Sequence, residues 1–395
     1  MFFMSEHMIV GIIGAPNKGK STLFSAMTMA SAEIADYPFT TIKPNHGIAY
    51  AARQCVEREL HIKCKPRNSM CVDGTRLIPI DIVDVAGLVP GAHLGKGMGN
   101  QFLNDICGAS VLIQVVDASG KSDANGNRAE GADAYDEVKM VKEELSLWLA
   151  DIISRHMPKL SKEEDGAKAL REVLSGFKVS EYDIKKAASA ATLTLSKMKW
   201  STAETQKFSS ELLRISKPMI IAANKIDKAT DEDIKRLAVS LKGCDVILCS
   251  GMVELALRKT SKEGKINYVP GERNFEVLED ISAEQAGAFE YIRRFLAKRS
   301  TGVNELINEA AFSREGNIVV YPVEDENKFT DHFGNTLPDA VVMKGGSTAM
   351  DLAAKIHSEL AVNMIYAVDA KKKIRVAKDY VLKDNDVIKI VSAAK

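Results

Sequence analysis

Residues 14–21 read GAPNKGKS and directly follow the apolar run MIVGII. Gly14 and Gly19 let the backbone turn so that successive N–H groups point at one phosphate, and a helix that begins near Lys20 adds its N-terminal dipole. Lys20 would neutralise the β/γ-phosphates, and the Ser21 hydroxyl would ligate Mg²⁺. This spacing predicts a nucleoside triphosphate site. We expect nucleotide contacts from the other loop positions as well, which are Ala15, Pro16, Asn17, Lys18 and Thr22.

The sequence DVAG places Asp84 at the end of a second apolar run, with Gly87 three residues later. The aspartate would hold Mg²⁺ through water, and the Gly87 N–H would contact the γ-phosphate. DxxG alone occurs often by chance. Its value here comes from its position on the next parallel strand after the phosphate loop.

The sequence NKID contributes Asn224, Lys225 and Asp227. The Asp227 carboxylate can accept both N1–H and N2–H₂ of guanine, a donor pair that adenine lacks, so an unpaired buried acceptor would reject adenine. Asn224 would brace the loop, and the Lys225 stem would cover the base. The backbone N–H that follows Ser250, in Ser250-Gly251, would meet guanine O6. The predicted ligand is therefore a guanine nucleotide, GTP or GDP, with Mg²⁺.

These signatures need elements that bring them together. Short apolar runs at 8–14, 77–84, 110–118, 218–225 and 245–250 are apolar on both faces, as buried parallel strands are. Helical patterns lie between most of them, which predicts right-handed βαβ units and an open α/β sheet. Ligands of such sheets bind outside the carboxyl ends of the strands, where every signature above lies.

Several longer segments resemble a known family. YPFTTIKPN at 37–45 and DVAGLVPGAHLGKGMGNQF at 84–102 are similar to the Obg-related GTPases, most of all to the archaeal and fungal guanine-type subgroup of the YchF/OLA1 branch. LPDAVVMKGGSTAMDLAAKIH at 337–357 and YVLKDNDVIKIV at 380–391 resemble a TGS domain, which is a small β-grasp module. The resemblance spans nearly the whole chain. It implies a translation-linked GTPase that visits the ribosome.

The chain departs from that family at three positions. Many YchF members have NxxE and prefer ATP, whereas Asp227 restores the guanine pattern. The last signature is normally SA, but here it is Ser250-Gly251. Lys18 stands where the family usually has an apolar residue, and nothing in the sequence explains it.

The sequence does not identify the residue that would orient the attacking water. In small GTPases a glutamine follows DxxG, and here that position is Leu88, which we expect in the core. His93 is one candidate, and its alternative role is that of a solvated loop residue. Gln101 is a second candidate, and its alternative role is to cap a helix. Asn17 would hold K⁺, as in potassium-activated relatives, or would stabilise the loop.

Thr40 and Thr41 are the candidates for the switch threonine that ligates Mg²⁺ when the triphosphate is bound, and Thr41 is preferred. Together with the missing glutamine, this predicts a Mg²⁺-dependent GTP hydrolase with slow intrinsic turnover.

The predicted fold class is α/β: a P-loop G domain at 1–127 and 216–312, a helical insertion at 128–215 and a β-grasp (TGS) domain at 313–395. Apolar residues recur at helical spacing early in the insertion, at Val138, Val141, Leu145, Trp148 and Ile152. With further helical patterns near 162–174, 180–199 and 201–215, this suggests a helical hairpin. Its apolar stripe indicates internal packing, with docking of a protein partner as the alternative. A helix at 282–299 would close the G domain, and one helix near 348–360 would lie in the tail.

Two groups of side chains outside the signatures could bind a ligand. The tail holds a basic cluster, for which we weigh a solvated hairpin against contact with RNA phosphates, without aromatic residues for base stacking. Its members are Lys344, Lys371, Lys372, Lys373, Arg375 and Lys378. The other group is Cys55, His61, Cys64 and Cys71, which lacks the paired spacing of zinc sites and favours an extended loop with free thiols.

The totals limit the alternatives. Lys+Arg and Asp+Glu are both 53 in 395 residues, so no global charge points to nucleic acid or a membrane. We find no signal peptide or membrane span, and six cysteines without a CxxC pair suit a reducing cytoplasm. The favoured function is a GTP switch that binds the ribosome or rRNA. A GTP-gated protein-binding module is the alternative, and an ATP-dependent P-loop kinase is disfavoured by NKID.

Overall fold

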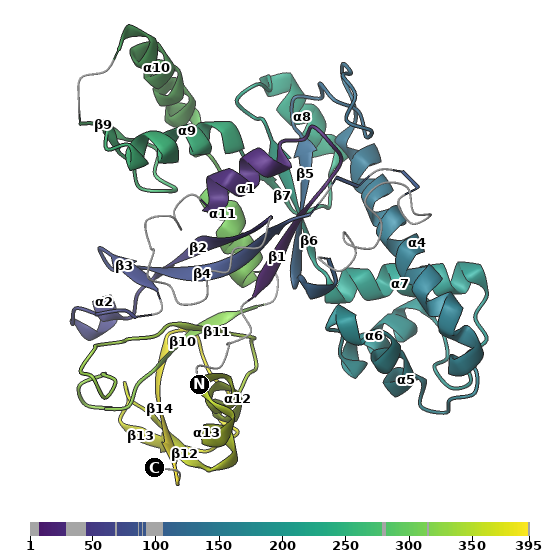
Figure 1. Ribbon diagram of the computed structural model, residues 1–395, viewed down its shortest axis with the longest axis vertical. Coiled ribbons are helices and arrows are strands. Elements are labelled where there is room, and N and C mark those ends of the chain that lie inside the picture. Colours follow the sequence, from purple (N-terminus) through teal and green to yellow (C-terminus); the bar gives the residue numbers. More distant parts are fainter. Residues whose placement is uncertain are drawn as a thin grey trace.

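The computed structural model describes residues 8–28, 45–67, 69–85, 87–88, 90–91, 106–278, 282–313 and 316–393. A seven-stranded sheet forms the centre of the N-terminal part, with the order β2-β4-β1-β5-β6-β7 and β3 paired to β4 (Figure 1). Its strands are β1 (Ile9–Ile13), β2 (His46–Gln54), β3 (Met70–Val72), β4 (Thr75–Asp84), β5 (Val111–Asp117), β6 (Met219–Asn224) and β7 (Val246–Leu248).

The five predicted strands are confirmed and run parallel to one another. The sequence did not predict the antiparallel extension formed by β2 and β3 on β4. Every residue of β5 is buried, because helices cover both faces of the sheet. Val10 and Ile12 pack on the face covered by α1 (Lys20–Thr28) and α11 (Val303–Asn308), and Ile13 packs on the face covered by α4 (Ala134–Leu160).

The insertion has an α-helix at each predicted segment and one short 3₁₀ helix in addition. Besides α4 it consists of α5 (Gly166–Val173), η3 (Ser175–Phe177), α6 (Glu181–Ala191) and α7 (Thr202–Ser216). These elements surround a shared core that includes Leu170, Ile184 and Phe208. The helix predicted for 180–199 ends at Ala191, because Thr192 adopts a left-handed conformation with φ 61°. The apolar stripe of α4 is buried in this packing and against the sheet.

A small subdomain follows the sheet. α8 (Asp231–Ser240) connects β6 to β7 and packs on the sheet through Leu237. The subdomain after β7 consists of α9 (Gly251–Lys262), β8 (Ile266–Asn267), β9 (Glu276–Val277) and α10 (Ala283–Lys298), with α11 and η4 (Glu309–Ser313) after it. Leu257 of α9 packs against Phe289 and Leu296 of α10. The predicted helix at 282–299 therefore packs on α9, and its Phe295 also packs against the cluster that contains Ile221 of β6.

The C-terminal domain has a five-stranded sheet with the order β11-β10-β14-β12-β13, in which only β10 and β14 are parallel. Its elements are β10 (Ile318–Pro322), β11 (Val341–Met343), α12 (Ala349–Ile356), α13 (Ser358–Val362), β12 (Met364–Asp369), β13 (Ile374–Val376) and β14 (Asp386–Ser392). The single helix predicted near 348–360 is two helices, because His357 is extended and caps α13.

The two domains share buried contacts. Tyr321 and Leu337 of the C-terminal domain belong to the same core cluster as Ile78 of β4. The segment after α2 (Glu57–Leu60) adds backbone hydrogen bonds, from Lys65 N to Thr336 O (2.8 Å) and from Arg67 N to Pro338 O (2.7 Å). Among the described helices, none is long and apolar enough to span a membrane.

Candidate nucleotide-binding site

The phosphate loop connects β1 to α1 at the carboxyl edge of the sheet. Gly14 has φ +140°, and a Cβ there would lie 2.6 Å from Val115 O of β5. Gly19 has φ +88°, and its Cβ would lie 2.6 Å from Nδ2 of Asn224. Glycine is required at both positions, since a side chain would meet both strained backbone and close neighbours.

The NKID segment holds this loop directly. Asn224 Nδ2 donates to Lys18 O at 3.0 Å, and Lys225 Nζ donates to Asn17 O at 2.7 Å. Asn224 comes at the end of β6 and is buried, so its bond to Lys18 O is shielded from water, whereas the bond from Lys225 is exposed. The residues predicted to read the base therefore also fix the loop predicted to bind the phosphates.

The predicted metal residues Ser21 and Asp84 meet at the end of β4. Ser21 Oγ donates to Asp84 Oδ2 at 2.9 Å, whereas Asp84 Oδ1 is buried and receives no hydrogen bond from any described residue. Burial raises the pKa of Asp84, against the opposing effects of Ser21 and Lys20. A hydroxyl beside an unsatisfied buried carboxylate oxygen fits a bound cation or its water shell.

Lys20 lies between the two signatures. Its ammonium donates to Ala15 O at 2.8 Å, and burial lowers its pKa although Asp84 and Glu137 raise it. A Cβ on Gly87 would lie 3.3 Å from Lys20 Nζ, so the DVAG segment lies against the phosphate loop. Leu88 N donates to Gly14 O at 3.1 Å, and the Leu88 side chain is buried in the core as expected.

The side of the site that is predicted to bind the base is organised around Asp227. Ser250 Oγ donates to Asp227 Oδ1 at 2.6 Å and also accepts from Val253 N as the N-cap of α9. The N–H after Ser250, expected to meet guanine O6, donates to Asn224 Oδ1 at 2.9 Å. A residue that the sequence did not single out, Tyr291 of α10, donates from its hydroxyl to Asp227 O at 2.7 Å.

The glycine in Ser250-Gly251 has a packing reason. A Cβ on Gly251 would lie 3.1 Å from Leu23 Cα and 3.2 Å from Leu23 N in α1. The start of α9 therefore lies closer to α1 than an alanine tolerates without a shift. This explains why the chain departs from the usual SA signature.

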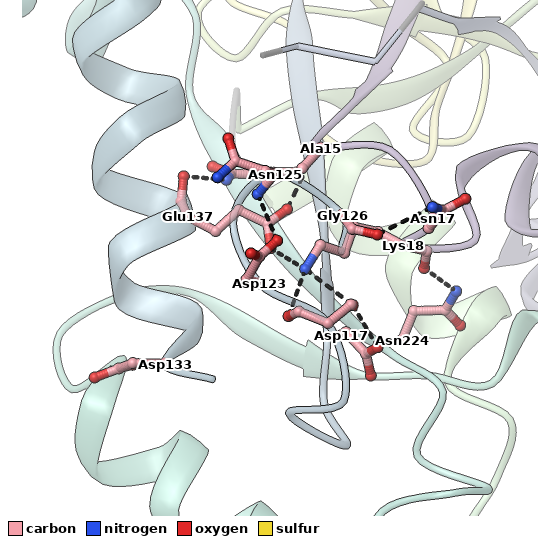
Figure 2. A network of polar contacts seen from close by, with 12 residues as sticks. Ala15, Asn17, Lys18, Asp117, Asp123, Asn125, Gly126, Asp133, Glu137 and Asn224 are labelled. Atoms are coloured by element: carbon pink, nitrogen blue, oxygen red, sulfur yellow. Dashed lines mark hydrogen bonds and ion pairs between the residues drawn. The ribbon is translucent and has the colours of Figure 1, made fainter. Parts of the chain in front are cut away.

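The unexplained Lys18 is buried, with 1% exposure, and forms an ion pair with Glu137 of α4 at 2.9 Å (Figure 2). Its ammonium also donates to Ser122 O (3.0 Å) and to Ser122 Oγ (3.1 Å). Glu137 Oε1 accepts from Ala15 N at 3.2 Å, and burial raises the pKa of Glu137 against the opposing effect of Lys18. The lysine is thus compensated by the first turns of the insertion.

The segment after β5 completes this network. Asp117, at the end of β5, accepts from Ser119 Oγ at 2.6 Å, Ser122 Oγ at 2.7 Å and Lys225 Nζ at 2.9 Å. Burial opposes ionisation, but these hydrogen bonds lower the pKa of Asp117. Figure 2 shows Asp117 and Asn224 close to Lys18 of the loop.

Asn17 has φ 62°, and its Nδ2 donates to Gly126 O at 3.0 Å. This contact is the loop-stabilising role that we weighed for Asn17. Potassium ligation by Asn17 stays a prediction.

The sequence placed Asp117, in VDASG, at the carboxyl edge of the sheet but gave it no role, and it did not single out Glu137. Asp117 carried a usable signal, since it is an acidic residue that ends a fully buried strand. Glu137 carried none, because it reads as an ordinary residue in the first turns of a long helix. Four of the predicted catalytic and switch residues, Thr40, Thr41, His93 and Gln101, lie outside the described residues.

The members of the predicted cysteine group differ in the structure. Cys55, Cys64 and Cys71 converge, but their fourth neighbour is Glu57 and not His61. His61 is exposed and ends α2 in a left-handed conformation with φ 53°. The thiols are free, as expected, but they lie after β2, after α2 and in β3 and not in one extended loop.

Comparisons with known proteins agree with these observations. Family profiles match residues 222–325 (Obg-like GTPase YGR210-like, G4 motif-containing domain), 9–153 (50S ribosome-binding GTPase) and 333–392 (TGS domain). An uncharacterized GTP-binding protein of Methanocaldococcus jannaschii is 50% identical over 395 residues, which cover 98% of this chain and 100% of that protein. The ribosome-binding ATPase YchF of Bacillus subtilis is 27% identical over 413 residues, 96% of this chain and 98% of that one.

Among solved structures, a GTP-binding protein from Pyrococcus horikoshii OT3 superposes with a TM-score of 0.79 at 38% identity, covering 98% of this chain and 100% of that chain. The likeness thus extends over the G domain, the insertion and the C-terminal domain together. The chain belongs to the Obg-related GTPases of the YchF type, with a C-terminal TGS domain.

Proposed function

We propose that this protein binds GTP with Mg²⁺ and hydrolyses it slowly to GDP and phosphate, and that its GTP form associates with the ribosome or rRNA. The observation that supports nucleotide binding most is the direct bonding of NKID to the phosphate loop, through Asn224 Nδ2 to Lys18 O and Lys225 Nζ to Asn17 O. The segment proposed to bind the base and the loop proposed to bind the phosphates are therefore connected by hydrogen bonds.

Each described residue of the site has a task in this proposal. Asp227 accepts the two guanine donors, and the Lys20 ammonium leaves Ala15 O for the β/γ-phosphates. Ser21 and Asp84 hold Mg²⁺, which neutralises charge on the phosphates. Leu88 cannot orient water, so we expect slow turnover of the isolated protein.

The base preference is tested by Asp227→Asn. An amide nitrogen donates where the carboxylate accepts, so the variant should lose GTP affinity by about 10-fold or more and should favour xanthosine triphosphate. Competitive titration of GTP, ATP and xanthosine triphosphate measures this. Retained GTP preference in the variant would contradict guanine recognition by Asp227.

The ribosome part of the proposal is supported by the names of similar proteins and by the tail. Two lysines of the basic cluster form ion pairs within the protein, Lys371 with Glu59 and Lys372 with Asp369. Arg375 is exposed, and its guanidinium lies 3.7 Å from the ring centroid of Tyr366. No aromatic residue is interleaved with residues 371–378 of this cluster in the sequence, and the prediction on base stacking stays untested. β12 and β13 bring Tyr366 beside Arg375 across the sheet.

Ribosome co-sedimentation tests this part. The protein should pellet with a non-hydrolysable GTP analogue, less with GDP, and less at higher salt, because phosphate contacts release counterions. Arg375→Ala with Lys378→Ala should weaken pelleting, whereas Lys235→Ala with Lys242→Ala on and after α8 removes the same charge elsewhere and should not. Absence of pelleting in every nucleotide state would overturn the ribosomal role. RNase-insensitive binding would favour a protein partner.

A further inference from the structure

Three cysteines and one glutamate lie together at the end of the sheet nearest the C-terminal domain. Cys55 follows β2, Glu57 begins α2, Cys64 follows α2, and Cys71 lies in β3. Their ligand atoms all lie within 4.8 Å of one another. Tetrahedral Zn²⁺ with Zn–S bonds of about 2.3 Å places its sulfur ligands about 3.8 Å apart, so this four-ligand cluster has the size of a zinc site.

The backbone holds the cluster in place. Cys55 N donates to Gly74 O at 2.9 Å, which ties the end of β2 to the β3–β4 turn. Cys64 N donates to Glu57 Oε2 at 2.8 Å, and Cys71 Sγ lies 3.3 Å from Glu57 Oε1. The carboxylate thus contacts the Cys71 sulfur with one oxygen, while the Cys64 backbone holds the other oxygen in place.

A buried charge beside the cluster is a second, independent observation. Arg76 of β4 is fully buried, and its Nε and Nη1 have no hydrogen-bond partner among the described residues. Its charge acts on Glu57 and Cys64. Three thiolates and a carboxylate around a divalent cation carry a net negative charge, which gives a buried guanidinium the compensation it needs.

The donor set selects the ion. Three thiolates are soft ligands that favour zinc over Mg²⁺ or Ca²⁺, and four protein ligands leave no open position for substrate. We propose that this chain binds one structural Zn²⁺ through four side chains, those of Cys55, Glu57, Cys64 and Cys71.

The position of the cluster gives the ion a task. The chain between Cys64 and Cys71 carries the backbone bonds from Lys65 to Thr336 and from Arg67 to Pro338. Arg67 also pairs with Asp339 at 2.6 Å. An ion that fixes both ends of this segment holds the G domain and the C-terminal domain together.

Metal analysis of the full-length protein tests the site. We expect one equivalent of zinc after purification without chelator, and one equivalent of Co²⁺ bound by the stripped protein, with a thiolate-to-cobalt absorption band. Cys64→Ser and Cys71→Ser should weaken binding by more than the roughly 10–100-fold loss caused by changing an outer-shell residue. Cys244→Ser and His61→Ala, which lie outside the cluster, should bind Zn²⁺ like the unaltered protein.

A second measurement keeps the test independent of variant folding. Removing zinc from the unaltered protein with a chelator should lower its thermal midpoint and speed proteolysis near residues 64–71, and added Zn²⁺ should reverse both effects. Less than stoichiometric zinc together with no effect of chelator would overturn the proposal. So would loss of binding in His61→Ala, or a disulfide within the cluster in protein purified without reductant. None of these results depends on nucleotide or ribosome binding.

Discussion

At the scale of single residues, the stability of the phosphate loop depends on the ion pair between Lys18 and Glu137. Both side chains are almost fully buried, and Glu137 also accepts a hydrogen bond from the loop backbone at Ala15 N. Burying two charges is costly, and a buried pair stabilises a protein only while both partners and their hydrogen bonds remain. The pair therefore makes the loop depend on a residue of the insertion.

Glu137→Ala leaves the Lys18 ammonium buried without its carboxylate. We expect the free energy of unfolding to fall by about 3–5 kcal/mol, and the affinity for a GTP analogue to fall as well. The double variant Lys18→Met with Glu137→Leu replaces the pair by apolar groups and should recover most of this loss. Denaturant unfolding of all three variants measures the coupling.

The matched control is Glu143→Ala, which removes an exposed ion pair with Lys139 on the same helix. Its cost should stay below about 1 kcal/mol. If Glu137→Ala costs no more than this control, Lys18 is stabilised by other groups and the dependence on Glu137 does not exist.

At the scale of elements, two helix contacts set the geometry of the site. α4 touches the phosphate loop through Glu137 and the segment after DVAG through Glu144, whose Oε1 accepts from Gly91 N at 2.7 Å. α9 lies close against α1 at Gly251. The contacts of α4 connect the candidate nucleotide segments to the insertion. The contact of α9 fixes the predicted guanine side of the site relative to the predicted phosphate side.

The α4 contact predicts a response to the nucleotide. Because α4 contacts both segments that are predicted to face the phosphates, a GTP analogue and GDP should give different amide hydrogen exchange at residues 134–145. Glu144→Ala removes one of the two contacts and should reduce the difference. Equal exchange with both nucleotides in the unaltered protein would show that the insertion does not sense the γ-phosphate.

The α9 contact predicts an effect of restoring the usual signature. Gly251→Ala places a methyl group 3.1 Å from Leu23 Cα, and we expect a destabilisation of about 1–3 kcal/mol with weaker guanine nucleotide binding. Gly287→Ala in the exposed part of α10 has no atom within 4 Å of the added Cβ. It should stabilise by about 0.5–1 kcal/mol. Thermal unfolding with and without GDP compares the two, and equal effects would refute the packing explanation.

At the scale of the whole molecule, the G domain and the C-terminal domain share a core and should unfold together. Arg76 reaches across the boundary and donates from Nη2 to Leu337 O at 2.8 Å. Its guanidinium also faces Tyr321, 5.6 Å from the ring centroid. The connection is buried, so it does not depend on surface ion pairs alone.

Arg76→Met removes this donor and leaves Leu337 O buried without it. We expect a loss of about 1–3 kcal/mol and two separate transitions in calorimetry, where the unaltered protein shows one. Arg67→Ala removes a half-exposed pair with Asp339 and should leave a single transition. One transition in Arg76→Met, at an unchanged midpoint, would show that the shared apolar core suffices.

The sequence by itself determined the phosphate loop, Asp84, NKID and their order, and hence the sheet and the place of the site. It could do so because parallel strands put their carboxyl ends at one edge, so local patterns along the chain become neighbours in space. The tertiary structure alone decided the partner of Lys18, the reason for Gly251, and the aromatic neighbour of Arg375. It also decided that Glu57, and not His61, joins the cysteines. Each of these depends on packing between elements or on where a helix ends, and such contacts leave no periodic or spaced pattern in the sequence.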